Sequence, residues 1–187
     1  MIRIYSFEPR YFDNNGDQGN IEVIERLLRA QGVEVERTAS VEFADFVLLG
    51  DCSIAVLEKF KFQLQELLPA LRSRLATGSP TLIVGRTYEY LAPLLGISLN
   101  VGERTSAFLE VQTDFGLLWG YHNSEVLEPR VFSKGLFMGT TLFGPLLAKN
   151  PELTSAVCKG FGIELSSTVY ERAVQLAQLA KTNTTFG

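Results

Sequence analysis

A buried strand, a sharp turn and a helix are predicted over residues 80–91, an arrangement that mounts a reactive side chain in many α/β enzymes. In such an elbow, a Ser or Cys nucleophile occupies the turn. Here the turn residue is Gly85, which has no side chain. The scaffold of a catalytic elbow without its reactive atom favours a binding protein over a catalyst.

The remaining candidates for thiol chemistry are few, because the chain has two cysteines, Cys52 and Cys158, and one histidine, His122. A cysteine paired with a histidine can act as nucleophile and base. Cys52 follows a predicted strand at the same sheet edge as the elbow, so a Cys52/His122 dyad is an alternative hypothesis. Lone cysteines are commonly inert and partly buried, and Cys158, among apolar residues of a predicted helix, is assigned to the core.

Four polar or charged residues are candidates for ligand binding: Asp17, Asn20, Arg86 and Arg104. Asp17 and Asn20 lie in a turn-rich loop after the first strand, at the sheet edge where α/β proteins bind ligands, but they also suit a helix cap and a tight turn. Arg86 points either into the pocket, towards an anion, or into solvent. Arg104 either binds a carboxylate bidentately or forms a surface ion pair.

Strands and helices alternate through the first half of the chain. Strands are expected at residues 2–7, 33–38, 46–49 and 80–84, with a helix after the loop at 13–20 and helical periodicity over 54–75, broken near Pro69. The second half favours adjacent strands at 105–111 and 116–121, a strand at 136–143, and helices at 151–161 and 168–181. This alternation predicts a mostly parallel sheet covered on both faces, in a single domain over residues 1–187.

Composition narrows the classes of function. The 187 residues are 46% hydrophobic and 20% charged, with a net charge of −4 and no basic run, so nucleic acid is not the expected partner. No apolar stretch reaches membrane-span length, and no signal pattern opens the chain, so we expect a cytoplasmic protein with reduced thiols. Glycine-rich phosphate loops are absent, and two distant cysteines with one histidine predict no metal site or cofactor.

Three segments resemble one family when they are taken in order: residues 15–21, the elbow at 80–91, and residues 139–153 with their Gly-Pro-Leu-Leu-Ala-Lys-Asn-Pro-Glu-Leu run. Together they are similar to the class I glutamine amidotransferases of the cobyric-acid-synthase type. The nearest likeness is to GatD, the glutaminase subunit of lipid II isoglutaminyl synthase, which serves peptidoglycan synthesis. The resemblance implies a flavodoxin-like three-layer α/β sandwich.

The departures from this family carry the functional prediction. Its members hydrolyse glutamine with a cysteine at the elbow and a histidine just before Gly-Pro-Leu-Leu. In this sequence those positions are Gly85 and Phe143, which we expect to lie close together at the carboxyl edge of the sheet. Neither residue can attack an amide or carry a proton, so no glutaminase activity is expected.

Two classes of function follow from the resemblance. The first is a catalytically inactive amidotransferase-like subunit that binds, scaffolds or regulates, with a Mur-ligase-like synthetase as the expected partner and a small ligand in the former glutamine pocket. The second is an active amidotransferase or hydrolase whose chemistry has moved to Cys52 and His122.

Overall fold

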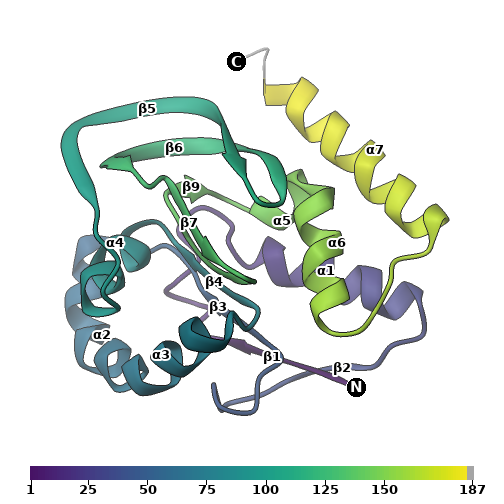
Figure 1. The fold of residues 1–187 in the computed structure, drawn as a ribbon, viewed down its shortest axis with the longest axis horizontal. Helices are drawn as coiled ribbons and strands as arrows, with labels where there is room; N and C mark the ends of the chain where they lie inside the picture. Colours follow the sequence, from purple (N-terminus) through teal and green to yellow (C-terminus); the bar gives the residue numbers. More distant parts are fainter. Residues whose placement is uncertain (185–187) are drawn as a thin grey trace.

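The computed structural model describes residues 1–184, with side chains through residue 182, and builds them around a mostly parallel six-stranded sheet (Figure 1). The strands lie in the order β2 (Val35–Arg37), β1 (Ile2–Ser6), β3 (Phe46–Leu49), β4 (Thr81–Val84), β8 (Phe137–Thr140) and β7 (Val131–Lys134). The first five strands are parallel, and β7 pairs antiparallel with β8 at one edge.

Helices cover both faces of this sheet. One layer contains α1 (Gly19–Ala30), α5 (Leu146–Lys149), α6 (Pro151–Gly160) and α7 (Ser167–Thr184); the other contains α2 (Ile54–Glu66), α3 (Leu68–Thr77) and α4 (Gly85–Leu94). Side chains alternate between the two faces along a strand, so β3 sends Leu48 into the first core and Val47 and Leu49 into the second. The structure confirms the predicted flavodoxin-like three-layer arrangement.

A second, antiparallel sheet lies beside the first, formed by β5 (Asn100–Thr113), β6 (Gly116–Glu128) and β9 (Leu142–Phe143). The predicted neighbouring strands at 105–111 and 116–121 are confirmed as a hairpin, although both strands are longer than expected. Most of β5 is exposed, so its ends lack the burial pattern that marks a strand in sequence.

One predicted strand is wrong. Residues 136–143 form two strands in different sheets, because the chain bends at Thr141 between β8 and β9. The Thr140 hydroxyl accepts a hydrogen bond from the Leu142 N–H at 2.9 Å, which fixes the bend. β8 then pairs with β4, and β9 pairs with β6, with Phe143 opposite Tyr121. This bend carries Phe143 over the carboxyl edge of the larger sheet.

The expected cap of the first helix is also wrong. The N-cap residue of α1 is Gln18, and no side chain caps it. Its backbone N–H donates instead to Asp13 Oδ1 at 2.8 Å, earlier in the loop. Asp17 and Asn20, which were the predicted caps, are both fully buried and bond elsewhere. The prediction failed because these two side chains accept hydrogen bonds from the backbone N–H groups of Asp51 and Leu147, which are distant in sequence.

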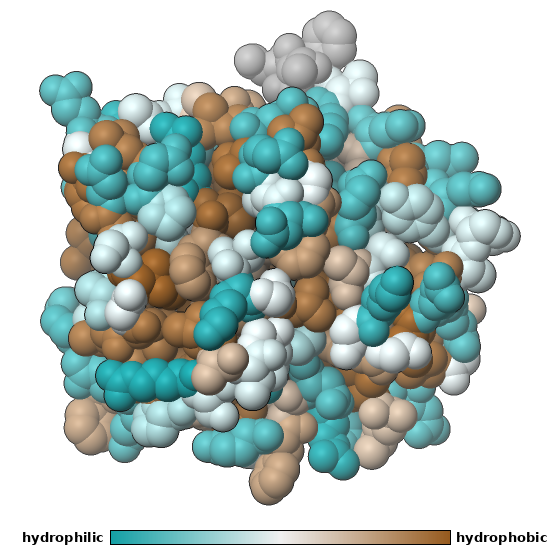
Figure 2. Space-filling model, in the orientation of Figure 1, coloured by the Kyte–Doolittle hydropathy of each residue, from teal (hydrophilic) through white to brown (hydrophobic). Residues whose placement is uncertain are grey.

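The molecular surface mixes residue types. On the face seen in Figure 2, hydrophobic side chains gather in patches between hydrophilic ones. Within residues 1–184, no helix combines the length and the apolar character needed to cross a bilayer.

Candidate functional site: a filled elbow beside a polar cavity

The elbow forms as the sequence predicts, with β4 ending at Val84 and α4 beginning at Gly85. Val84 is extended, with φ −116° and ψ 142°, whereas Gly85 has φ +60°. This left-handed conformation is costly for residues with a Cβ and nearly free for glycine. Gly85 therefore preserves the sharp turn.

The space above Gly85 is filled by two other side chains. A Cβ added at Gly85 would lie 2.6 Å from Phe143 Cε1 and 2.7 Å from Asp51 Cγ, well inside van der Waals contact. Both neighbours are buried, with 9% of Phe143 and 4% of Asp51 exposed. The two positions expected to meet, Gly85 and Phe143, do meet, and no room remains between them for a nucleophilic side chain.

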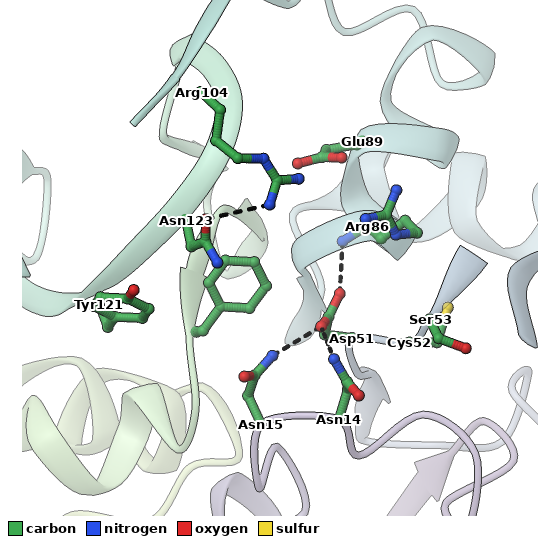
Figure 3. A pocket seen from close by; sticks show the side chains of 11 residues that line it. Asn14, Asn15, Asp51, Cys52, Ser53, Arg86, Glu89, Arg104, Tyr121 and Asn123 are labelled. Atoms are coloured by element: carbon green, nitrogen blue, oxygen red, sulfur yellow. Dashed lines mark hydrogen bonds between the residues drawn. The ribbon is translucent and has the colours of Figure 1, made fainter. Parts of the chain in front are cut away.

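The Asp51 carboxylate sits at the start of α4 and accepts three hydrogen bonds. Its Oδ1 accepts from the Arg86 backbone N–H at 2.8 Å, and its Oδ2 accepts from the side-chain amides of Asn14 at 3.1 Å and Asn15 at 2.8 Å (Figure 3). A negative charge is stabilised at a helix N-terminus by the exposed N–H groups and the helix dipole. Three hydrogen bonds therefore fix the position of the Asp51 carboxylate.

This position matters because of what the Arg86 N–H does in a catalytic elbow. There, the N–H after the nucleophile stabilises the oxyanion of the tetrahedral intermediate. Here that donor is already bound to the Asp51 carboxylate. A substrate carbonyl would have to displace a buried charge with three hydrogen bonds before it reached the donor.

Asp17 lies beneath Asp51 and is fully buried. Its Oδ2 accepts a hydrogen bond from the Asp51 backbone N–H at 2.9 Å, while its Oδ1 has no partner in the structure. Burial, aided by the nearby charges of Asp51 and Asp13, raises the pKa of Asp17 from 3.8 to about 7. Asp17 therefore holds the backbone of Asp51 after the end of β3, and it is not among the residues that line the cavity.

Asn20 joins the start of α1 to the Gly-Pro-Leu-Leu segment. Its Oδ1 accepts from the Leu147 N–H at 2.8 Å, and its Nδ2 donates to the Asp17 carbonyl at 2.9 Å. The side chain is fully buried and its polar groups are used, so it positions two segments. As with Asp17, the structure places this predicted ligand residue outside the cavity lining.

A polar cavity of about 160 Å³ opens beside the elbow, and it contains the other two predicted ligand residues, Arg86 and Arg104 (Figure 3). Arg104 donates to Asn123 Oδ1 at 3.2 Å. Glu89 also lines the cavity and accepts from the Ser124 hydroxyl. Among the described residues, neither arginine forms an ion pair with a carboxylate. The cavity wall therefore contains two guanidinium groups and two carboxylates, those of Asp51 and Glu89.

The alternative dyad is not hydrogen-bonded in the structure. Cys52 Sγ lies 3.7 Å from the Thr87 hydroxyl, and burial raises the pKa of the Cys52 thiol to about 11. His122 is fully buried; its Nδ1 lies 2.9 Å from the Thr141 hydroxyl and its Nε2 has no partner. Burial, followed by the charge of Arg130, lowers the pKa of His122. Cys52 touches the cavity, but His122 is not among its lining residues.

Sequence reasoning missed the central role of Asp51 and of its amide partners, Asn14 and Asn15. The available signal was the position of Asp51, two residues after a predicted buried strand, where parallel strands place functional side chains. The asparagines belong to the polar loop that the sequence marked only as turn-forming.

Comparison with known proteins identifies the fold. The chain is similar in structure to a glutamine amidotransferase from Thermotoga maritima, with 17% sequence identity, coverage of 97% of this chain and 94% of the other, and a TM-score of 0.50. A proposed GMP synthase subunit from Thermoplasma acidophilum gives 13% identity over 97% and 98% of the two chains at a TM-score of 0.44. Another glutamine amidotransferase gives 14% identity over 86% and 99% at 0.48.

No protein-family model matches the sequence, and no curated protein matches it either. On the basis of the structural similarity, the chain has the fold of the class I glutamine amidotransferases. A sequence identity of 17% establishes the fold alone.

Proposed function

We propose that this chain is a catalytically inactive, amidotransferase-like protein that acts in the cytoplasm as a binding, scaffold or regulatory subunit. One observation carries the proposal: the Asp51 carboxylate and the Phe143 ring fill the space in which a residue at position 85 would attack a substrate. The filling is reinforced because Asp51 also holds the Arg86 N–H. Gly85 supplies no nucleophile, and Asp51 and Phe143 occupy the space that one would need, so the three residues together disfavour amide hydrolysis.

The relocated-chemistry alternative has weaker support. A nucleophilic cysteine needs its thiolate, and the raised pKa of Cys52 keeps the thiol protonated near neutral pH. His122, buried against Thr141, shows no hydrogen bond to that sulfur. Cys52 is therefore assigned to packing at the cavity wall.

An ammonia-release assay tests the proposal directly. We expect no glutamine-dependent ammonia from the wild-type protein, and none from a Gly85→Cys/Phe143→His variant, because the new side chain at position 85 meets Asp51 and the oxyanion donor remains occupied. A variant that also carries Asp51→Gly lacks the obstructing carboxylate. This triple variant is the one expected to bind glutamine at the elbow.

The control for this assay is Cys52→Ala. Wild-type turnover that disappears in Cys52→Ala would overturn the proposal in favour of the second hypothesis. Full activity in the Gly85→Cys/Phe143→His variant alone would refute the blocking role assigned to Asp51. Circular dichroism of each variant ensures that loss of structure is not mistaken for loss of activity.

The partner we propose is a Mur-ligase-like synthetase, on the strength of the family resemblance in residues 139–153. Arg86 and Arg104, which line the cavity together with the carboxylates of Asp51 and Glu89, suit the carboxylate group of a small ligand. Affinity purification of the tagged chain from its own host is expected to recover such a synthetase, and mass spectrometry of the denatured sample is expected to detect a small carboxylate. Recovery of the chain without a synthetase under native conditions would contradict the assignment.

A further inference from the structure

The outer edge of β5 is a long strand edge that nothing in the described structure covers. β5 is last in its sheet and has 14 residues, and residues 100–108 are all exposed. In Figure 1 it runs along the rim of the molecule, with β6 on its inner side. Within residues 1–184, β5 makes no backbone–backbone hydrogen bond outside its pairing with β6.

The other sheet edges of this protein are short. β2 has three residues, β7 has four and β9 has two. Short edge strands are a common protection against unwanted pairing, because they offer few free N–H and C=O groups. β5 is the exception, and its sheet is nearly a two-stranded ribbon, since β9 adds only two residue pairs. Such ribbons gain stability from further strands.

The charges on β5 indicate which strand would pair with its free edge. Arg104 and Glu110 are exposed, and Glu110 forms no ion pair in the described structure. They lie on the same face, because Arg104 bonds the side chain of Asn123, the partner of Ser106, and Glu110 follows Ser106 by four residues of regular strand. When an antiparallel strand pairs with its own copy about a two-fold axis, opposing residue numbers add to a constant. Two opposing residues must both direct their N–H and C=O groups towards the partner strand, or both away from it. Because this direction alternates from one residue to the next, opposing residue numbers are both odd or both even, and their sum is even.

Only one such register matches the charges. With Ala107 opposite its own copy, Arg104 faces Glu110 and Glu110 faces Arg104, so two opposite-charge pairs form at once. The neighbouring registers bring Glu103, Arg104 or Glu110 against a neutral residue or against its own copy. The matching register lies near the centre of β5. The pairing of β5 with β6 is regular from Thr105 onwards, and Arg104 is the last residue of the irregular stretch that precedes it.

We propose that this protein forms a two-fold symmetric dimer in which the β5 edges of two copies pair antiparallel around Ala107. The two small sheets then join into one, in the order β9-β6-β5-β5-β6-β9. The same surface patch serves both copies, as an isologous interface requires. The dimer also brings Glu110 of the second copy to Arg104, at the rim of the polar cavity. This proposal does not rest on the proposed function.

Sedimentation over a range of protein concentrations tests the dimer. We expect a concentration-dependent dimer for wild type, and dimerisation weakened about tenfold by Glu110→Lys, which turns both attractive pairs into like-charge pairs. Exchanging the charges with Arg104→Glu/Glu110→Lys is expected to restore it. The matched control, Glu125→Lys, changes an exposed acid on β6 away from the edge and should leave dimerisation intact.

Disulfide trapping tests the register. Ala107→Cys is expected to form an intermolecular disulfide with oxidised glutathione, because opposing Cα atoms in the pair lie about 5 Å apart. Thr105→Cys should not, since its copy lies four residues away along the strands, about 13 Å. A monomer at every concentration up to the solubility limit would overturn the proposal. So would a dimer indifferent to Glu110→Lys, or equal trapping by the two cysteine variants.

Discussion

Replacing Gly85 with alanine is expected to destabilise the protein by about 3 kcal/mol or more, through two effects that add. The first is backbone strain, because a residue with a Cβ must adopt φ +60°. The second is overpacking, because the new Cβ would lie 2.6 Å from Phe143 Cε1 and 2.7 Å from Asp51 Cγ. Urea denaturation of the variant and wild type measures the difference in the free energy of unfolding.

Gly16→Ala separates the two effects. Gly16 has φ +75°, and a Cβ there would meet no atom within 4 Å, so this variant carries only the backbone cost, about 1 kcal/mol. In a Phe143→Ala background, Gly85→Ala should cost about 1 kcal/mol less, because one of the contacts is gone. Equal costs for Gly85→Ala and Gly16→Ala would mean that position 85 is open, and the account of a filled elbow would be wrong.

The larger parallel sheet could be predicted from sequence because its signals are local. Residues 46–49 are four consecutive apolar residues stopped by Gly50, and the structure places β3 over the same four. The elbow likewise depends on one glycine between an apolar run and a helix, so its position was correct. A parallel strand that is buried on both faces needs consecutive apolar residues, and such a run is visible without any tertiary information.

The failures have a common physical origin in tertiary contacts. Residues 136–143 are continuously apolar or small, and nothing within them indicates that the chain changes sheet at Thr141. Asp51 was overlooked because its function depends on partners from two other segments, the loop with Asn14 and Asn15 and the start of α4. The loss of the two catalytic groups can be read from the sequence, but only the structure shows that a carboxylate has taken their place.

Asp17→Asn is expected to remove a pH dependence that the wild-type protein carries in its stability. The pKa of Asp17 is raised from 3.8 to about 7 in the folded protein, mainly by burial. The folded state therefore keeps a proton that the unfolded chain releases near pH 4. The stabilisation is fully present below about pH 4, is lost as the pH rises to about 7, and amounts to roughly 4 kcal/mol at most, at about 1.4 kcal/mol per pKa unit.

The comparison that tests this is the free energy of unfolding of wild type and Asp17→Asn, measured by urea denaturation at intervals between pH 4 and pH 7. Asparagine has the same shape, keeps an oxygen for the Asp51 N–H, and carries no charge, so the variant should lose less stability over this range. Asp13→Asn, in the same loop but exposed, removes only a minor contribution to the raised pKa of Asp17 and should retain most of the slope. Parallel curves for wild type and Asp17→Asn would show that Asp17 is ionised throughout this pH range. An ionised Asp17 would require a cationic partner, and the nearby Lys149 forms no ion pair with it in the described structure. Asp17 would then hold Asp51 through charge, and the support beneath the filled elbow would be ionic instead of a neutral hydrogen bond.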